Sequence, residues 1–115
     1  MVKKWDIYFV NLSPIQGSEQ KGTRPALVIS NDAVNMYLPI CTIIPFSSYN
    51  SNDKIYPTEM LLKRNVTGLS KDSILMLQQI RTIDKSRIIG PKVGVILDNS
   101  IKDDINNKLR DYFDL

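Results

Sequence analysis

The chain has 115 residues, a formal net charge of +3 and a pI near 9.0. This length suits one small domain over residues 1–115, and the mild basicity is compatible with a polyanionic partner. The apolar runs are too short to cross a bilayer and no apolar signal core follows the first lysines, so we expect a cytoplasmic protein without a membrane partner. Histidine is absent and Cys41 is the single cysteine, which excludes an internal disulfide. We expect neither a metal nor a cofactor.

The first half of the chain predicts three strands. Trp5–Leu12 is rich in aromatic and β-branched residues and indicates the first strand. A polar loop with prolines and glycines, residues 13–23, separates it from a second strand, Arg24–Ser30. Asn31 is expected to cap a short helical turn. The nearly continuous apolar run Ile40–Phe46 is typical of a strand buried on both faces.

The second half predicts further short strands. Tyr56–Leu62 and Ser73–Ile80 indicate two of them, with a turn closing on Gly68 between. In Arg81–Ile88 the apolar residues come at irregular intervals, which indicates a kinked or bulged strand. The dipeptide at 90–91, Gly-Pro, is expected to end that strand.

The last segment changes to a helical period. Ser100 followed by Asp103 predicts a variant capping box at its start. Spacings of four, four and three give one apolar helix face, made of Ile101, Ile105, Leu109 and Tyr112. Five or six strands and one helix predict a mainly β fold with α, a small antiparallel barrel with the C-terminal helix packed on it. Dimerisation would be an economical way to hide a sheet edge in so small a domain.

The most informative stretch runs from Gly17 to Asp32. A polar loop carrying Glu19 and Gln20 leads into Arg24, and a proline and an apolar strand follow at once. This order places a permanently charged guanidinium at the edge of a sheet, beside a carboxylate and an amide. Such a cation suits a phosphate ligand.

Four segments of the chain resemble the MazF/PemK toxin family in order. The resemblance spans most of the chain up to about residue 88, whereas the C-terminal helix matches in kind only. The matching segments are Asp6–Tyr8 with Leu12–Pro14, Gly17–Gln20 with Arg24–Ser30, Ile43–Ser48, and Gln79–Lys85 running on to Arg87.

This resemblance implies an SH3-like barrel, related in fold to CcdB, that forms a homodimer. It implies the toxin of a type II toxin–antitoxin system, an endoribonuclease that cuts single-stranded mRNA at a short sequence without a metal. It also implies a cognate antitoxin whose acidic, partly disordered tail occupies the RNA groove.

The resemblance also assigns site residues. The family's essential arginine falls on Arg24, its hydroxyl partner on Ser47, where a threonine is usual, and its loop carboxylate on Glu19. The adjacent Ser48 leaves open which hydroxyl serves. The predicted RNA-binding residues are Ser18, Gln20, Asn31, Ser48, Gln79 and Arg81.

The chemistry available is narrow because histidine is missing. Cleavage by the 2′-oxygen needs a proton acceptor and stabilisation of charge on the phosphoryl oxygens. Arg24 can bind the phosphate bidentately, and Ser47 can donate a hydrogen bond. Glu19 has the chemistry of a conventional base, whereas the pKa of an arginine makes Arg24 a poor one, so the base stays open between the two.

Two other functions compete with RNA cleavage. The same barrel could act as a CcdB-like toxin that binds and poisons DNA gyrase without catalysis. A peptide-binding SH3-like adaptor is the other alternative, and it would need an exposed aromatic groove. An arginine–hydroxyl pair with a groove at Gln79 and Arg81 would favour the nuclease, because a gyrase binder has no need of them.

Overall fold

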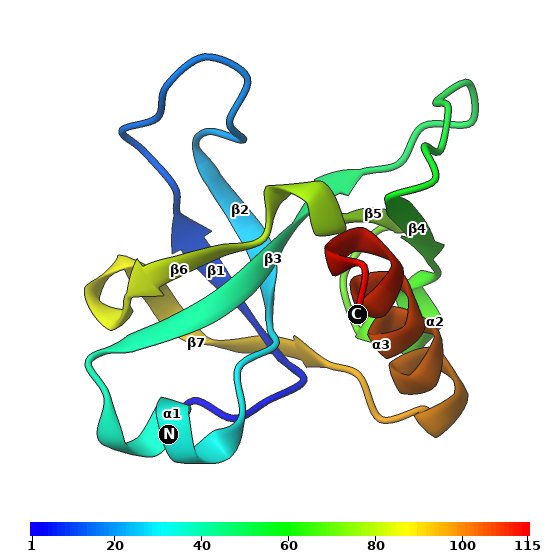
Figure 1. Cartoon of the computed structure of the whole chain (residues 1–115). Helices are drawn as coiled ribbons and strands as arrows, with labels where there is room; N and C mark the ends of the chain where they lie inside the picture. The colour runs from blue at the N-terminus through cyan, green and yellow to red at the C-terminus, as the bar shows by residue number, and fades with distance from the viewer.

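The computed structural model describes residues 1–115. Its elements in chain order are β1 (Asp6–Asn11), β2 (Thr23–Val28), α1 (Asp32–Tyr37), β3 (Ile40–Ser48), β4 (Glu59–Leu62), α2 (Arg64–Thr67), β5 (Ser73–Met76), η1 (Leu77–Gln79), β6 (Arg81–Asp84), η2 (Lys85–Arg87), β7 (Ile88–Val95) and α3 (Asn99–Phe113). Here η marks a 3-10 turn. The predicted class, mainly β with a C-terminal helix, is confirmed, with seven strands instead of five or six (Figure 1).

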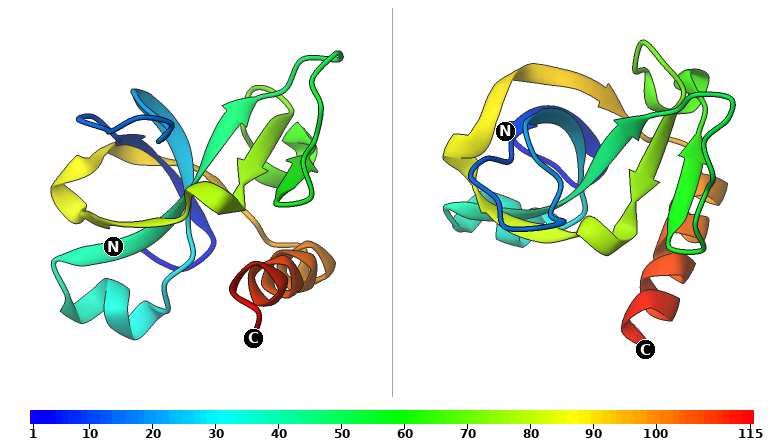
Figure 2. Two further views of the ribbon diagram at one scale, coloured as in Figure 1. Left: turned by 45° about the horizontal axis from the view of Figure 1, so that its top comes forward. Right: turned by 90° about the horizontal axis from the view of Figure 1, so that it is seen from above.

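The sheet is organised around β3, its longest strand. The strand order is β4-β5-β3-β2-β1-β7, with β6 also paired to β3, and every pairing is antiparallel. Residues 40–43 of β3 pair with β6, residues 43–45 with β2 and residues 46–48 with β5. The chain passes from β6 through η2 into β7, which pairs with β1, so the sheet curls round on itself (Figure 2).

Two hydrophobic cores lie on the two faces of the central strands. Alternate residues of β3 divide between them, because side chains of a strand point to opposite faces in turn. The core beneath α3 contains Ile7, Leu27, Ile44, Phe46, Leu62, Leu75, Leu77, Ile96 and Ile105. The core inside the barrel contains Tyr8, Val10, Leu12, Ala26, Val28, Cys41, Ile43 and Ile83. The prediction that the β3 segment is buried on both faces is therefore confirmed.

The predicted turns around both short helices are confirmed. The side chain of Asn31 caps α1 by accepting from Val34 N–H at 2.9 Å. The turn after β4 closes as α2, and Gly68 ends it in the left-handed conformation that favours glycine. None of the helices combines the length and the apolar character that a bilayer crossing requires.

Three predicted strands are shorter than expected. The strand predicted over Arg81–Ile88 ends at Asp84, where the turn η2 interrupts it. The strand predicted from Tyr56 begins only at Glu59, because Glu59 N–H bonds back to Tyr56 O at 2.9 Å and forms a turn. The strand predicted to reach Ile80 ends at Met76 and continues as η1. Continuing the β3–β5 register places Met76 opposite Pro45, which has no N–H to donate, so the ladder stops there.

The prediction that the Gly-Pro pair at 90–91 ends a strand is wrong. β7 runs through both residues to Val95. The β1–β7 register shifts between Ile7 and Phe9, so the extra residues of β7 bulge out without partners on β1. A bulge accommodates both a proline without N–H and a glycine at φ +71°.

The predicted face of α3 is confirmed at three of its four residues, and the cap of the helix is different. Ile105 is buried, and Ile101 and Leu109 pack against the same core, whereas Tyr112 is 42% exposed. The helix begins one residue before Ser100, so Ser100 cannot be its cap. Asp98 is the N-cap and accepts from Ile101 N–H at 3.1 Å.

Candidate active site

Arg24 lies at the start of β2 with its guanidinium held by neutral groups. Its Nε donates to Lys21 O at 2.9 Å. The amide of Gln20 lies against the same guanidinium, and with its oxygen facing the arginine it accepts from Nη2 at 2.6 Å. Neither of the two ion pairs in the molecule involves Arg24. The charge of Arg24 is thus oriented but not neutralised, and it stays available to a ligand.

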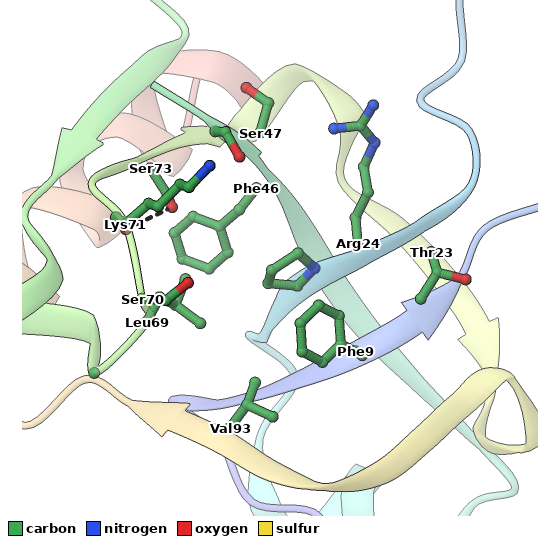
Figure 3. Close-up of a pocket in the computed structure, with 13 residues that line it drawn as sticks. Phe9, Thr23, Arg24, Phe46, Ser47, Leu69, Ser70, Lys71, Ser73 and Val93 are labelled. Carbon is green, nitrogen blue, oxygen red and sulfur yellow. Dashed lines mark hydrogen bonds between the residues drawn. The ribbon is translucent and has the colours of Figure 1, made fainter. Parts of the chain in front are cut away.

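Arg24 faces a pocket of about 500 Å³ together with Ser47 and Ser48. The last pair between β2 and β3 is Ala26 with Pro45. Two residues further along each strand, the same register places Arg24 opposite Ser47. Figure 3 shows both side chains at this pocket, with the aromatic rings of Phe9 and Phe46 lining it beside them. The residues that line it are Phe9, Thr23, Arg24, Pro25, Phe46, Ser47, Ser48, Gly68, Leu69, Ser70, Lys71, Ser73 and Val93.

No aspartate or glutamate lines this pocket. Its charged members are two cations, Arg24 and Lys71, and its polar members are hydroxyls. Such a composition attracts an anion, since opposite charge is supplied and no carboxylate repels it. The apolar part of the lining would suit the uncharged part of the same ligand.

Glu19 is not brought together with Arg24 and Ser47 in this pocket. It lines a separate, smaller pocket of about 170 Å³. Its Oε1 accepts from Gln16 N–H at 2.6 Å, which closes a turn within the loop. The position is that of a loop-forming carboxylate.

Gln79 connects η1 to the β1–β2 loop through both ends of its amide. Its Oε1 accepts from Gln20 N–H at 3.1 Å, and its Nε2 donates to Ser18 O at 3.2 Å. Gln79 therefore fixes the backbone from which the Gln20 side chain reaches Arg24. Ser18 takes part through its carbonyl oxygen.

Two arginines hold the base of the same loop. Arg81 donates from Nη1 to Leu12 O at 3.1 Å. Arg87, which was not predicted as a site residue, donates from Nη1 to Asn11 O at 3.1 Å and to Ser13 O at 2.7 Å. Both side chains bind backbone carbonyls, so the loop is tied to the β6–η2 segment at three places.

Asn31 is the one predicted site residue that lies apart from all the others. It follows the opposite end of β2 from Arg24, and its side chain is occupied in capping α1. Its sequence proximity to the arginine does not translate into spatial proximity, because an extended strand carries it away.

Sequence reasoning missed the part of the pocket that comes from distant segments. Lys71 and Ser70 belong to the loop between α2 and β5, and Val93 belongs to β7. Lys71 stands in a short polar turn that any surface loop could have, so the sequence held no signal for it. No group of His, Cys, Asp or Glu side chains in the structure is arranged to hold a metal ion.

Comparison with known proteins identifies the family. Residues 3–113 match the model for the PemK-like, MazF-like toxin of type II toxin–antitoxin systems. The chain is 38% identical over 109 residues to the endoribonuclease MazF of Staphylococcus saprophyticus, covering 95% of this chain and 88% of the relative.

Solved structures share the fold. MazF from Deinococcus radiodurans superimposes with a TM-score of 0.81 at 23% identity, covering 99% of this chain and 97% of that one. A mycobacterial endoribonuclease in complex with its cognate antitoxin gives a TM-score of 0.75 at 19% identity, covering 100% of this chain and 97% of the other. The chain therefore belongs to the PemK-like, MazF-like toxins of type II toxin–antitoxin systems.

Proposed function

We propose that this protein is an endoribonuclease that cuts single-stranded mRNA at a short sequence by attack of the 2′-oxygen, without a metal. The observation that carries this proposal is the pocket that pairs Arg24 with Ser47 and contains no carboxylate. The name of the Staphylococcus saprophyticus relative, an endoribonuclease, supports the same reaction class.

In this mechanism the phosphodiester occupies the space between Arg24 and Ser47. Arg24 would stabilise the charge that builds up on the phosphoryl oxygens, and its fork can make two parallel hydrogen bonds to them. Ser47 would donate a third bond, with Ser48 as the neighbouring alternative. The contacts of Arg24 with Lys21 O and Gln20 hold the guanidinium before RNA arrives, so less order is lost on binding.

Of the two bases left open by the sequence, Glu19 is the one whose position argues against direct proton transfer. Its Oε1 is occupied by Gln16 N–H, and the residue lines the smaller pocket. We assign it to loop structure. Arg24 would then stabilise charge and relay the proton: it would give a proton to the 5′-oxygen as the bond from phosphorus to that oxygen breaks, and take the proton that the attacking 2′-hydroxyl loses.

The partner of the free toxin would be an antitoxin with an acidic segment. Relatives of this fold have been solved with their cognate antitoxin, including MazE–MazF of Deinococcus radiodurans. Two unneutralised cations in one pocket give an acidic tail a place to bind. Such a tail would block the pocket that RNA needs.

The test is cleavage of a long RNA by the purified protein in the presence of a chelator, followed by mapping of the new ends. A 5′-hydroxyl with a 2′,3′-cyclic phosphate or 3′-phosphate at recurrent sites is the expected result. Arg24→Ala prepared in parallel controls for contaminating nucleases. Intact RNA, or equal cleavage by the variant, would contradict the proposal. Trapping of gyrase by an inactive protein would instead favour the gyrase-binding alternative.

A further inference from the structure

Lys71 is a second unneutralised cation in the large pocket. It extends from the loop between α2 and β5, whereas Arg24 comes from β2. Figure 3 shows the two side chains on opposite sides of the pocket, with Ser47 between them. The two cations thus reach one space from segments far apart in the sequence.

The backbone around Lys71 is held in place. Lys71 O accepts from the Ser73 hydroxyl at 3.0 Å, and Asp72 O accepts from Tyr49 N–H at 3.1 Å, just beyond the end of β3. These bonds tie the loop to the strand that carries Ser47. The base of the lysine side chain is therefore fixed relative to the pocket.

The nearest carboxylate in sequence, Asp72, has other partners. Its Oδ2 lies 3.6 Å from Lys63 Nζ, and its Oδ1 accepts from Arg64 N–H at 2.9 Å. The amino group of Lys71 takes part in neither of the two ion pairs. A lysine kept near an acid-free pocket while its neighbouring acid binds elsewhere is suited to an anionic ligand.

We propose that Lys71 binds a second RNA phosphate, adjacent to the one held by Arg24 and Ser47. One nucleotide would then span the pocket, with its uncharged part over Phe9, which is 38% exposed. The pocket volume of about 500 Å³ is in the range of small-ligand sites. This inference rests on the proposed endoribonuclease function. It adds a residue that binds the substrate at a phosphate other than the one that is cut.

A cation that contacts an adjacent phosphate equally in the ground and transition states changes KM and leaves kcat alone. Lys71→Gln should therefore raise KM several-fold with little change in kcat. The matched control is Lys3→Gln, which removes the same charge from an exposed lysine that lines neither of the two pockets described above. Lys71→Arg should restore most of the affinity, since a cation returns to the same position.

The direct experiment measures binding to a short RNA that spans a mapped cleavage site and carries 2′-deoxyribose at the scissile position. The slope of log Kd against log salt concentration should fall by about 0.7 for Lys71→Gln, the value for one lost phosphate contact with a single strand. Lys3→Gln should keep the native slope. Melting temperatures of all variants control for folding.

Replacing each phosphate that flanks the scissile one, in turn, with an uncharged methylphosphonate then tests whether Lys71 binds that phosphate. One of the two neutral linkages should weaken binding by the native protein and have no further effect on Lys71→Gln. If native protein cleaves RNA while Lys71→Gln matches Lys3→Gln in KM and salt slope, the role of Lys71 is wrong and the proposed function stands. If native protein leaves RNA intact, both are overturned.

Discussion

Arg24 shows how a single residue can be placed for chemistry by its neighbours. Its guanidinium is oriented by one backbone carbonyl and one side-chain amide, both neutral. The loop therefore orients the guanidinium, while its positive charge stays available to a ligand. Ser47 supplies a hydroxyl from the neighbouring strand.

Replacing Arg24 with lysine separates these two properties. The substituted side chain would keep the positive charge but lose the planar fork and its contacts with Lys21 O and Gln20. We expect Arg24→Lys to reduce kcat by about 10²-fold or more, the scale seen when one transition-state donor is removed. Single-turnover cleavage of an end-mapped RNA measures this. Near-native cleavage by the variant would show that charge alone is sufficient.

Glu19 is the second residue whose role can be isolated. Glu19→Gln keeps an oxygen that can accept from Gln16 N–H but removes the negative charge. Because we assign the residue to loop structure, we expect cleavage close to the native rate and an unchanged pH profile. A loss of about 10²-fold or more would identify Glu19 as a general base instead.

At the scale of elements, the position of the β1–β2 loop is controlled by contacts from residues that lie outside the loop. Gln79, Arg81 and Arg87 bind loop carbonyls or amides from the β6 side of the barrel. The resemblance placed Gln79 and Arg81 in the RNA groove, and that role stays a prediction. Their contacts show that they also determine where the loop lies.

The start of α3 provides a prediction of its own. Asp98 caps the helix through Ile101 N–H, whereas Ser100 lies inside the first turn. Asp98→Ala should lower the free energy of unfolding by about 1 kcal/mol, the usual cost of losing an N-cap. Ser100→Ala should have a much smaller effect. Urea denaturation of both variants measures the difference. A larger loss of stability for Ser100→Ala than for Asp98→Ala would favour the predicted capping box at Ser100.

At the scale of the whole molecule, the central strands separate two cores: one lies inside the barrel and the other lies beneath α3. The barrel interior encloses Cys41 and Tyr8. Burial raises the pKa of the Cys41 thiol, while Lys85 acts to lower it. Burial, and then the Asp6 carboxylate, raise the pKa of the Tyr8 phenol.

These shifts predict a loss of stability at alkaline pH. Both groups have a higher pKa in the folded chain, so the unfolded chain loses their protons first as pH rises. Stability should be retained below the ordinary thiol pKa of 9.0 and fall as the pH rises through that value and the phenol value of 10.0. Urea unfolding at successive pH values measures this, and Cys41→Ala should reduce the first part of the decline. A flat profile would contradict the prediction.

Oligomeric state is the remaining prediction at this scale. β4 and β7 are the terminal strands of the sheet, and apolar side chains such as Ile89 and Tyr37 are 47% and 78% exposed. Covering such surface favours association, so we expect a homodimer. Light scattering coupled to size exclusion should give about twice 13.1 kDa. A monomer mass that persists at high concentration would contradict the expectation.

The sequence by itself determined the local elements and the identity of the main charged residue. Aromatic and β-branched content, loop residues and an apolar run predicted β1, β2 and β3, helical spacing predicted α3, and the Gly17–Asp32 stretch singled out Arg24. These features depend on the composition and spacing of neighbouring residues, which are visible in one dimension.

Only the tertiary structure decided where the strands break and which distant residues share the pocket. β5 stops at Met76 because Pro45 of another strand would face it, and β7 passes Gly90 because β1 tolerates a bulge. Lys71 joins Arg24 for a similar reason: the loop that carries it is tied to the end of β3. Pairing and packing between segments far apart in the chain set these positions, and local sequence patterns do not encode them.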